Sequence, residues 1–254
     1  MTSSLEILTG NNLHSEVNKR IPILIDYPLG TCLLVDADRT LCPEDTGRLV
    51  GQVFGVNNRI RDIFETLDYH DDAFTAVSSI WSSIPSEAYL REIAIVANNL
   101  QIRNSWYEIL QKVKDYVPVI VITAGIPQVW RIALSKAGYT NIPVIGGCHR
   151  DLDEYVVSAK VKGEIVDVLR QLGWTVIAAG DSCTDLPMLT AANTALFVPD
   201  YKGSPSLRSK LNDVPDVRHL IVDAQRFDNI PTCSPIEAAE MVLCKGIWNA
   251  DRSY

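Results

Sequence analysis

The chain alternates between short apolar runs and segments with helical periodicity. The runs are rich in β-branched or aliphatic residues and lie at residues 32–35, 119–122, 142–145, 174–179, 195–198 and 220–222. After the second run, a helix is predicted to begin near Pro127 and to end at Gly138, in keeping with the preferences of these residues for helix termini. Strands that alternate with helices predict an α/β fold with a doubly wound, mainly parallel, Rossmann-like sheet.

The long interval between the first two predicted strands has no strand pattern. Its apolar residues recur at helical spacing, as in the stripe formed by Val77, Ile80, Trp81 and Ile84. We therefore expect an all-helical domain at residues 42–116, inserted into an α/β core made of residues 1–41 and 117–254. Residues 199–216, which are rich in proline, serine and charge, predict a surface loop with a short helix.

Polar residues follow three of the predicted strands directly. They form the segments Asp36-Ala37-Asp38-Arg39-Thr40, Thr123-Ala124-Gly125 and Gly180-Asp181-Ser182-Cys183-Thr184-Asp185. The carboxyl ends of parallel strands form the ligand crevice of an open α/β sheet. Closely spaced acids repel each other unless a cation or hydrogen bonds offset their charge. Lys162, at the start of a predicted helix, could bring an ammonium group there. Carboxylates, a lysine and a hydroxyl suit phosphate and a divalent cation.

These segments resemble the four motifs of the haloacid dehalogenase-like (HAD) phosphohydrolases. The motifs DADRT, VITAG, the lysine of AKVKGE and GDSCTD occur in this order between Asp36 and Asp185, and they are most similar to the phosphoserine phosphatase-like branch. The resemblance implies a Mg²⁺-dependent phosphomonoesterase that hydrolyses a small phosphorylated metabolite through an aspartyl-phosphate. It also implies that the helical insertion is a type 1 cap, which closes over the active site and carries substrate specificity.

The resemblance gives roles to the acidic residues. Asp36 would attack phosphorus, and Asp38 would protonate the leaving alkoxide and then deprotonate the attacking water. Asp36, Asp181 and the backbone carbonyl of Asp38 would hold Mg²⁺, with Asp185 supporting this shell of ligands.

The resemblance also gives the residues that bind phosphate. Thr123 and Ala124 would contact the phosphoryl oxygens, with the Thr123 hydroxyl as a donor. Lys162 would add a fixed positive charge where the transition state accumulates negative charge. Lys160 is an alternative for this role, although the sequence Lys-Gly-Glu before an apolar helix favours Lys162.

Three positions bear on substrate specificity. In the phosphoserine phosphatase-like branch, an acid after the first motif and an arginine on the cap clamp the amino and carboxylate groups of the amino acid. Asp45 keeps the acid, but Trp81 stands at the arginine position, and an indole cannot pair with a carboxylate. Thr184 stands where asparagine is common. Phosphoserine itself is therefore not the expected substrate. Trp81 either packs in the apolar stripe or contacts a less polar substrate.

Charge and composition exclude other partners. A net charge of −8 without a basic stripe disfavours nucleic-acid binding. Residues 1–20 are polar and lack the apolar stretch of a signal peptide, and no segment approaches a run of about 20 apolar residues. The six cysteines lack the Cys-x-x-Cys spacing. We expect a soluble, cytoplasmic monomer or homodimer with no membrane partner. Two other functions remain open: a phosphotransferase with an alcohol acceptor, and a regulatory HAD-fold protein without turnover.

Overall fold

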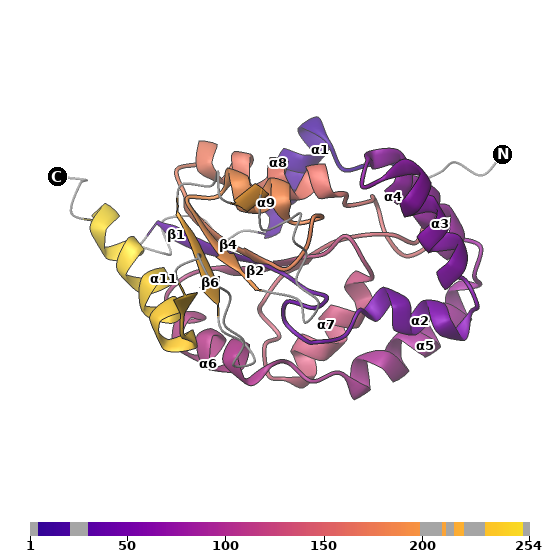
Figure 1. Cartoon of the computed structure of the whole chain (residues 1–254), viewed down its shortest axis with the longest axis horizontal. Helices are drawn as coiled ribbons and strands as arrows, with labels where there is room; N and C mark the ends of the chain where they lie inside the picture. The colour runs from indigo at the N-terminus through magenta and orange to yellow at the C-terminus, as the bar shows by residue number, and fades with distance from the viewer. Residues whose placement is uncertain (1–4, 21–29, 199–209, 212–215, 221–231, 251–254) are drawn as a thin grey trace.

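A parallel sheet forms the centre of the molecule (Figure 1). The computed structural model describes residues 5–20, 30–198, 210–211, 216–220 and 232–250. Within these residues the sheet has seven strands in the order β3-β2-β1-β4-β5-β6-β7, and each neighbouring pair is parallel. The strands are β1 (Thr31–Asp36), β2 (Val119–Ile122), β3 (Val144–Ile145), β4 (Thr175–Gly180), β5 (Thr194–Phe197), β6 (Val217–Leu220) and β7 (Thr232–Cys233). The predicted parallel α/β fold is confirmed.

Helices cover both faces of the sheet (Figure 1). One face packs against α1 (Gly10–Arg20), α8 (Ala159–Gln171) and α9 (Leu186–Ala191), and the other against α6 (Asn104–Val113), α7 (Pro127–Lys136) and α11 (Pro235–Ala250). Successive residues of β1 point to opposite faces of the sheet. Cys32 and Leu34 pack in the hydrophobic cluster on the face of α1, α8 and α9, and Leu33 and Val35 pack in the cluster on the face of α6, α7 and α11. Burial on both faces explains why the strands appear in the sequence as continuous apolar runs.

The chain between β1 and β2 is helical, as its periodicity predicts. It forms α2 (Thr46–Val53), α3 (Asn57–Leu67), α4 (Asp71–Trp81), α5 (Ser86–Asn99) and α6, which we call the helical insertion. Its last two helices return to the sheet, with α5 against α7 and α6 against α11. One hydrophobic cluster runs from the insertion into the sheet. The division into separate domains at residues 42–116 stays a prediction.

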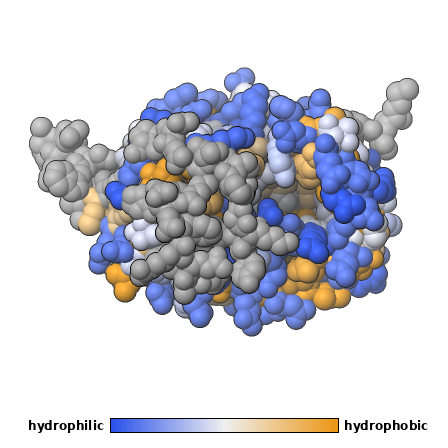
Figure 2. All heavy atoms as spheres, viewed as in Figure 1, coloured by the Kyte–Doolittle hydropathy of each residue, from blue (hydrophilic) through white to orange (hydrophobic). Residues whose placement is uncertain are grey.

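The described surface is mainly hydrophilic on the face shown in Figure 2, with hydrophobic residues in scattered groups. None of the described helices combines the length and the apolar character needed to cross a membrane. All six cysteines are free thiols, and Cys183 is partly exposed. Of the predicted surface loop, residues 199–209 and 212–215 lie outside the described part of the chain, as do residues 221–222 of the last predicted strand.

A close approach of α8 to α9 requires glycine at position 163. A methyl group on Gly163 would lie 2.9 Å from Pro187 Cβ and 3.1 Å from the Pro187 carbonyl oxygen. Neither the proline ring nor the backbone can turn away, so the helices would have to separate. The neighbouring residue, Lys162, contacts Asp185 at the start of α9, so this packing also sets the position of two predicted site residues.

We predict that Gly163→Ala lowers the free energy of unfolding by about 1–3 kcal/mol, because the clash outweighs the better helix propensity of alanine. Gly47→Ala in α2 is the control, since the nearest atom to its new methyl group is Asp45 Oδ1 at 3.5 Å. Urea unfolding of both variants measures the difference. Equal stability of the two would show that α8 and α9 can move apart without cost.

Candidate active site

Predicted site residues from three strand ends line one cavity. Its wall contains Asp36, Asp38, Arg39, Asp45, Thr123, Ala124, Gly125, Lys162, Asp181, Ser182 and Thr184. Asp36 ends the central strand β1, Thr123 follows β2 on one side, and Asp181 follows β4 on the other. The chain first extends the sheet through β2 and β3 and then returns to add β4 beside β1, so the cavity lies where the strand order reverses.

Lys162 lies between two buried carboxylates. Its side chain is 1% exposed, and its Nζ contacts Asp36 Oδ1 and, at 2.6 Å, Asp185 Oδ1. Burial alone would lower the pKa of Lys162, but Asp185 and Asp36 raise it above its ordinary value, so the ammonium group stays charged. Lys160 is exposed and pairs with Glu164 at 3.5 Å. The structure thus brings Lys162, and not Lys160, into the cavity.

Ser158 connects the helix that carries Lys162 to the helical insertion. Its hydroxyl caps α8 by accepting from the backbone N–H of Val161 at 3.4 Å. The same hydroxyl donates to Asp71 Oδ1 at 2.5 Å, at the first residue of α4. The position of α8 is therefore coupled to that of α4.

Three buried carboxylates form a group that suits a divalent cation. Asp36, Asp181 and Asp185 each offer an oxygen, and these oxygens lie within 4.8 Å of one another. Burial, with the nearby Asp185, raises the pKa of Asp36 to about 7, and burial with Asp185 and Asp36 raises that of Asp181. Asp181 Oδ2 is buried, and its nearest cation is Arg39 Nε at 3.2 Å. A buried set of carboxylate oxygens fits Mg²⁺, which prefers oxygen ligands.

Asp185 organises the loop that presents Asp181. Its Oδ2 accepts from the backbone N–H groups of Asp181 at 3.1 Å and Ser182 at 3.0 Å, and from the Ser182 hydroxyl at 2.9 Å. With Oδ1 held by Lys162, both oxygens have partners. Asp185 therefore fixes the loop and contributes charge. Thr184 lies on the cavity wall, within 2.7 Å of the Ser182 hydroxyl.

Asp38 is held by two N–H donors. Its Oδ1 accepts from the backbone N–H of Thr46 at 3.1 Å and from Trp130 Nε1 at 3.3 Å. Burial and the nearby Asp45 raise the pKa of Asp38 to about 6, against the lowering effect of the Thr46 hydrogen bond. Asp45 lies on the cavity wall and caps α2, where its Oδ1 accepts from the backbone N–H of Arg48 at 2.9 Å.

The loop after β2 closes tightly beside Asp38. Thr123 Oγ1 accepts from the backbone N–H of Gly125 at 2.9 Å, which leaves its hydroxyl hydrogen available to a ligand. A methyl group on Gly125 would lie 2.9 Å from Asp38 Oδ2, so a larger residue at this point would displace the Asp38 carboxylate. Ala124 lies between these two residues on the cavity wall.

Sequence reasoning missed two residues of the site. Arg39 lines the cavity, and its Nε lies 3.2 Å from Asp181 Oδ2. Its backbone is left-handed, with φ of 62°, an uncommon conformation for a residue with a side chain. In the sequence, only its place inside the first motif marks Arg39 as a possible site residue. Nothing in the sequence marks Trp130 in this way, because it occurs in an ordinary amphipathic helix.

Trp81 lies away from the cavity. Its side chain is 3% exposed within the hydrophobic core, and its ring lies 5.7 Å from that of Tyr89. It is absent from the cavity lining. The structure thus places Trp81 in the apolar stripe, and its position gives no support to a contact with substrate.

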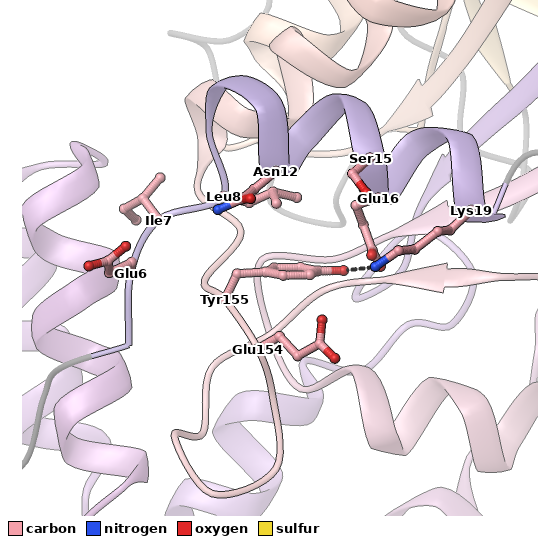
Figure 3. Close-up of a pocket in the computed structure, with 9 residues that line it drawn as sticks. All are labelled: Glu6, Ile7, Leu8, Asn12, Ser15, Glu16, Lys19, Glu154 and Tyr155. Carbon is pink, nitrogen blue, oxygen red and sulfur yellow. Dashed lines mark hydrogen bonds between the residues drawn. The ribbon is translucent and has the colours of Figure 1, made fainter.

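A second cavity lies between α1 and the segment before α8 (Figure 3). The Tyr155 hydroxyl points to Glu16 and donates to its Oε1 at 2.5 Å, while Arg20 pairs with the same oxygen. These contacts satisfy the buried carboxylate from within the protein. The lining contains no residue of the predicted site.

The buried position of Lys162 leads to a prediction about the stability of the fold. Lys162→Met should lower the free energy of unfolding by about 3–5 kcal/mol in the presence of a chelator, because it leaves buried carboxylates without a counter-charge. Lys160→Met, the control, removes an exposed lysine and should change stability by less than about 0.5 kcal/mol. Urea unfolding at neutral pH checks both. A similar, small effect of the two substitutions would contradict the buried ion pairs.

Comparison with known proteins identifies the family. The sequence profile of the haloacid dehalogenase-like hydrolases matches residues 33–190. No curated protein shows significant similarity to the chain.

Several solved structures share the fold. A phosphoserine phosphatase, solved as a phospho-aspartyl intermediate analogue, is 18% identical over 74% of this chain and 92% of its own, with a TM-score of 0.53. A HAD family hydrolase from Salmonella enterica subsp. enterica serovar Typhi is 18% identical over 83% of this chain and 77% of its own, with a TM-score of 0.54. Cytosolic 5′-nucleotidase IIIB bound to cytidine is 15% identical over 93% of this chain and 91% of its own, with a TM-score of 0.52.

At these identities the solved structures show a shared fold, and the sequence profile shows the family. The profile covers every motif from Asp36 to Asp185. The predicted family is confirmed, and with it the prediction of a hydrolase. The chain belongs to the haloacid dehalogenase-like hydrolases.

Proposed function

We propose that the protein is a Mg²⁺-dependent phosphomonoesterase that hydrolyses a small phosphorylated metabolite through an aspartyl-phosphate on Asp36. The observation that carries this proposal is the meeting of Asp36, Asp38, Lys162 and Asp181 at one cavity. A nucleophile, a proton carrier, a fixed cation and a metal ligand are the groups that phosphoryl transfer requires.

In the first step Asp36 attacks phosphorus. A bond forms between a carboxylate oxygen and phosphorus, and the bond from phosphorus to the alcohol oxygen breaks. Asp38 donates its proton to the departing oxygen, so the alcohol leaves as a neutral molecule. Lys162 fixes the orientation of Asp36 through Oδ1 and offsets the negative charge near phosphorus. Mg²⁺, when bound by Asp36, Asp181 and the Asp38 carbonyl, further neutralises the phosphoryl oxygens.

In the second step Asp38 accepts a proton from water. The resulting hydroxide attacks phosphorus, releases inorganic phosphate and restores Asp36. The pKa of about 6 for Asp38 suits both directions of transfer near neutral pH, because a group that must give and take a proton works best near the ambient pH.

The substrate is proposed to be a phosphate ester other than phosphoserine. Trp81 replaces the cap arginine of the phosphoserine phosphatase-like branch and lies in the core, so the helical insertion offers no guanidinium at that position. Asp45 and Thr184 line the cavity and are the proposed specificity residues. The helical insertion (42–116) would act as the cap. A phosphotransferase would use the same first step and pass phosphate to an alcohol, whereas a regulatory protein would show no turnover.

The test is phosphate release from a panel of phosphate esters that includes phosphoserine and nucleoside monophosphates. With Mg²⁺ and no alcohol acceptor, the wild type should release phosphate, and Asp36→Asn should lose at least about 10³-fold in kcat because an amide is a poor nucleophile. Acid quenching with a ³²P-labelled ester should trap label on the wild type and not on Asp36→Asn. Normal turnover by Asp36→Asn would exclude Asp36 as the nucleophile.

The metal is tested independently of turnover. Mg²⁺ should raise the melting temperature of the wild type, by an amount equivalent to about 2.7 kcal/mol at one hundred times the dissociation constant. Asp181→Asn should lose this response. Asp115→Asn, which changes a carboxylate that is 70% exposed, should keep it. Differential scanning fluorimetry with and without a chelator measures the shift, and an unchanged response of Asp181→Asn would remove Asp181 from the metal site.

A further inference from the structure

We infer that the buried indole of Trp130 is a positioning residue, which holds Oδ1 of Asp38 so that Oδ2 carries the proton to the leaving group. This inference rests on the proposed function, since it concerns the residue that protonates the alcohol. It assigns a role to a side chain that lies on α7, within the hydrophobic core, and that reaches Asp38 through its ring nitrogen.

The contacts distinguish the two oxygens of Asp38. Oδ1 receives two hydrogen bonds, from Thr46 N at 3.1 Å and from Trp130 Nε1 at 3.3 Å. A backbone N–H and an indole N–H are donors only, so neither can accept a hydrogen from a protonated Oδ1. A proton on Oδ1 would make this oxygen a poorer acceptor for both N–H groups. The proton of the acid form therefore belongs on Oδ2.

Oδ2 lies on the side of the carboxylate where the substrate would bind. It is the nearest atom to a methyl group built on Gly125, at 2.9 Å, and Gly125 follows Thr123 and Ala124 on the cavity wall. The predicted phosphate-binding residues are thus neighbours of the oxygen that carries the proton. The two donors thus keep the protonated oxygen of Asp38 on the side of the cavity.

Trp130 is well placed to keep this orientation. Its side chain is fully buried, and its helix α7 begins at Pro127, directly after the loop of Thr123 and Gly125. One short stretch of chain thus carries both the phosphate-binding loop and the donor to Asp38. Because the indole is packed on all sides, it cannot leave Asp38 without opening a cavity in the core.

The test compares two buried tryptophans. Trp130→Phe removes the N–H donor and keeps an aromatic ring. Trp106→Phe is the matched control, because Trp106 is also fully buried in the same hydrophobic cluster, and its Nε1 has no hydrogen-bond partner among the described residues. Both variants lose similar packing, and only the first loses a contact with Asp38. Thermal unfolding of each variant reports the cost to the fold.

The readout is kcat/KM for two esters that differ in their need for an acid. An alkyl phosphate requires protonation of its alkoxide, whereas p-nitrophenyl phosphate releases a stable phenolate. The value of kcat/KM covers steps up to release of the alcohol. We expect Trp130→Phe to lower it at least about 10-fold for the alkyl ester and less than about 3-fold for the nitrophenyl ester. Trp106→Phe should change kcat/KM by no more than about 3-fold for either ester.

Other results would overturn the inference. If Trp130→Phe lowers kcat/KM equally for both esters, or changes it for neither, the indole does not position the acid. If Trp106→Phe reproduces the selective loss, packing alone explains it. Failure of the proposed function has a different signature, since the wild type itself would then hydrolyse neither ester, and the role of Trp130 would fail with it.

Discussion

The site depends on the buried ion pairs that the ammonium group of Lys162 makes with Asp36 and Asp185. Two carboxylates buried side by side repel each other, and Lys162 offsets their charge from the first turn of α8. The contact fixes Asp36 at the end of β1. Through Asp185 it also fixes the loop that follows β4, so one ion pair network joins a helix to two strand ends.

Most of the fold follows from local patterns that burial imposes. Strands covered on both faces must be apolar throughout, and a helix with one covered face must repeat its apolar residues every third or fourth position. These rules act within a short stretch of chain, so the sheet and the helical insertion can be predicted from the sequence. The helix α1 was not predicted, because its few buried residues, Leu13, Glu16 and Val17, include a carboxylate that breaks the pattern.

The site could be predicted only in part. Asp36, Asp38, Asp181 and Lys162 stand in recognisable motifs at strand ends, and the structure brings them together. Trp81 and Trp130 show the limit of such reasoning, since both belong to amphipathic helices and are buried in the same cluster. Only Trp130 has its N–H directed at an acid of the cavity, 92 positions earlier in the chain. Periodicity says that a tryptophan is buried, but it does not say which polar atom its nitrogen meets.

Two hydrogen bonds described above join the helical insertion to the groups of the cavity. The backbone N–H of Thr46, the first residue of α2, holds Asp38, and Asp71, the first residue of α4, accepts from the cap of the helix that carries Lys162. The insertion is therefore not an interchangeable module. An insertion grafted from a relative would have to supply both contacts to keep Asp38 and α8 in their places.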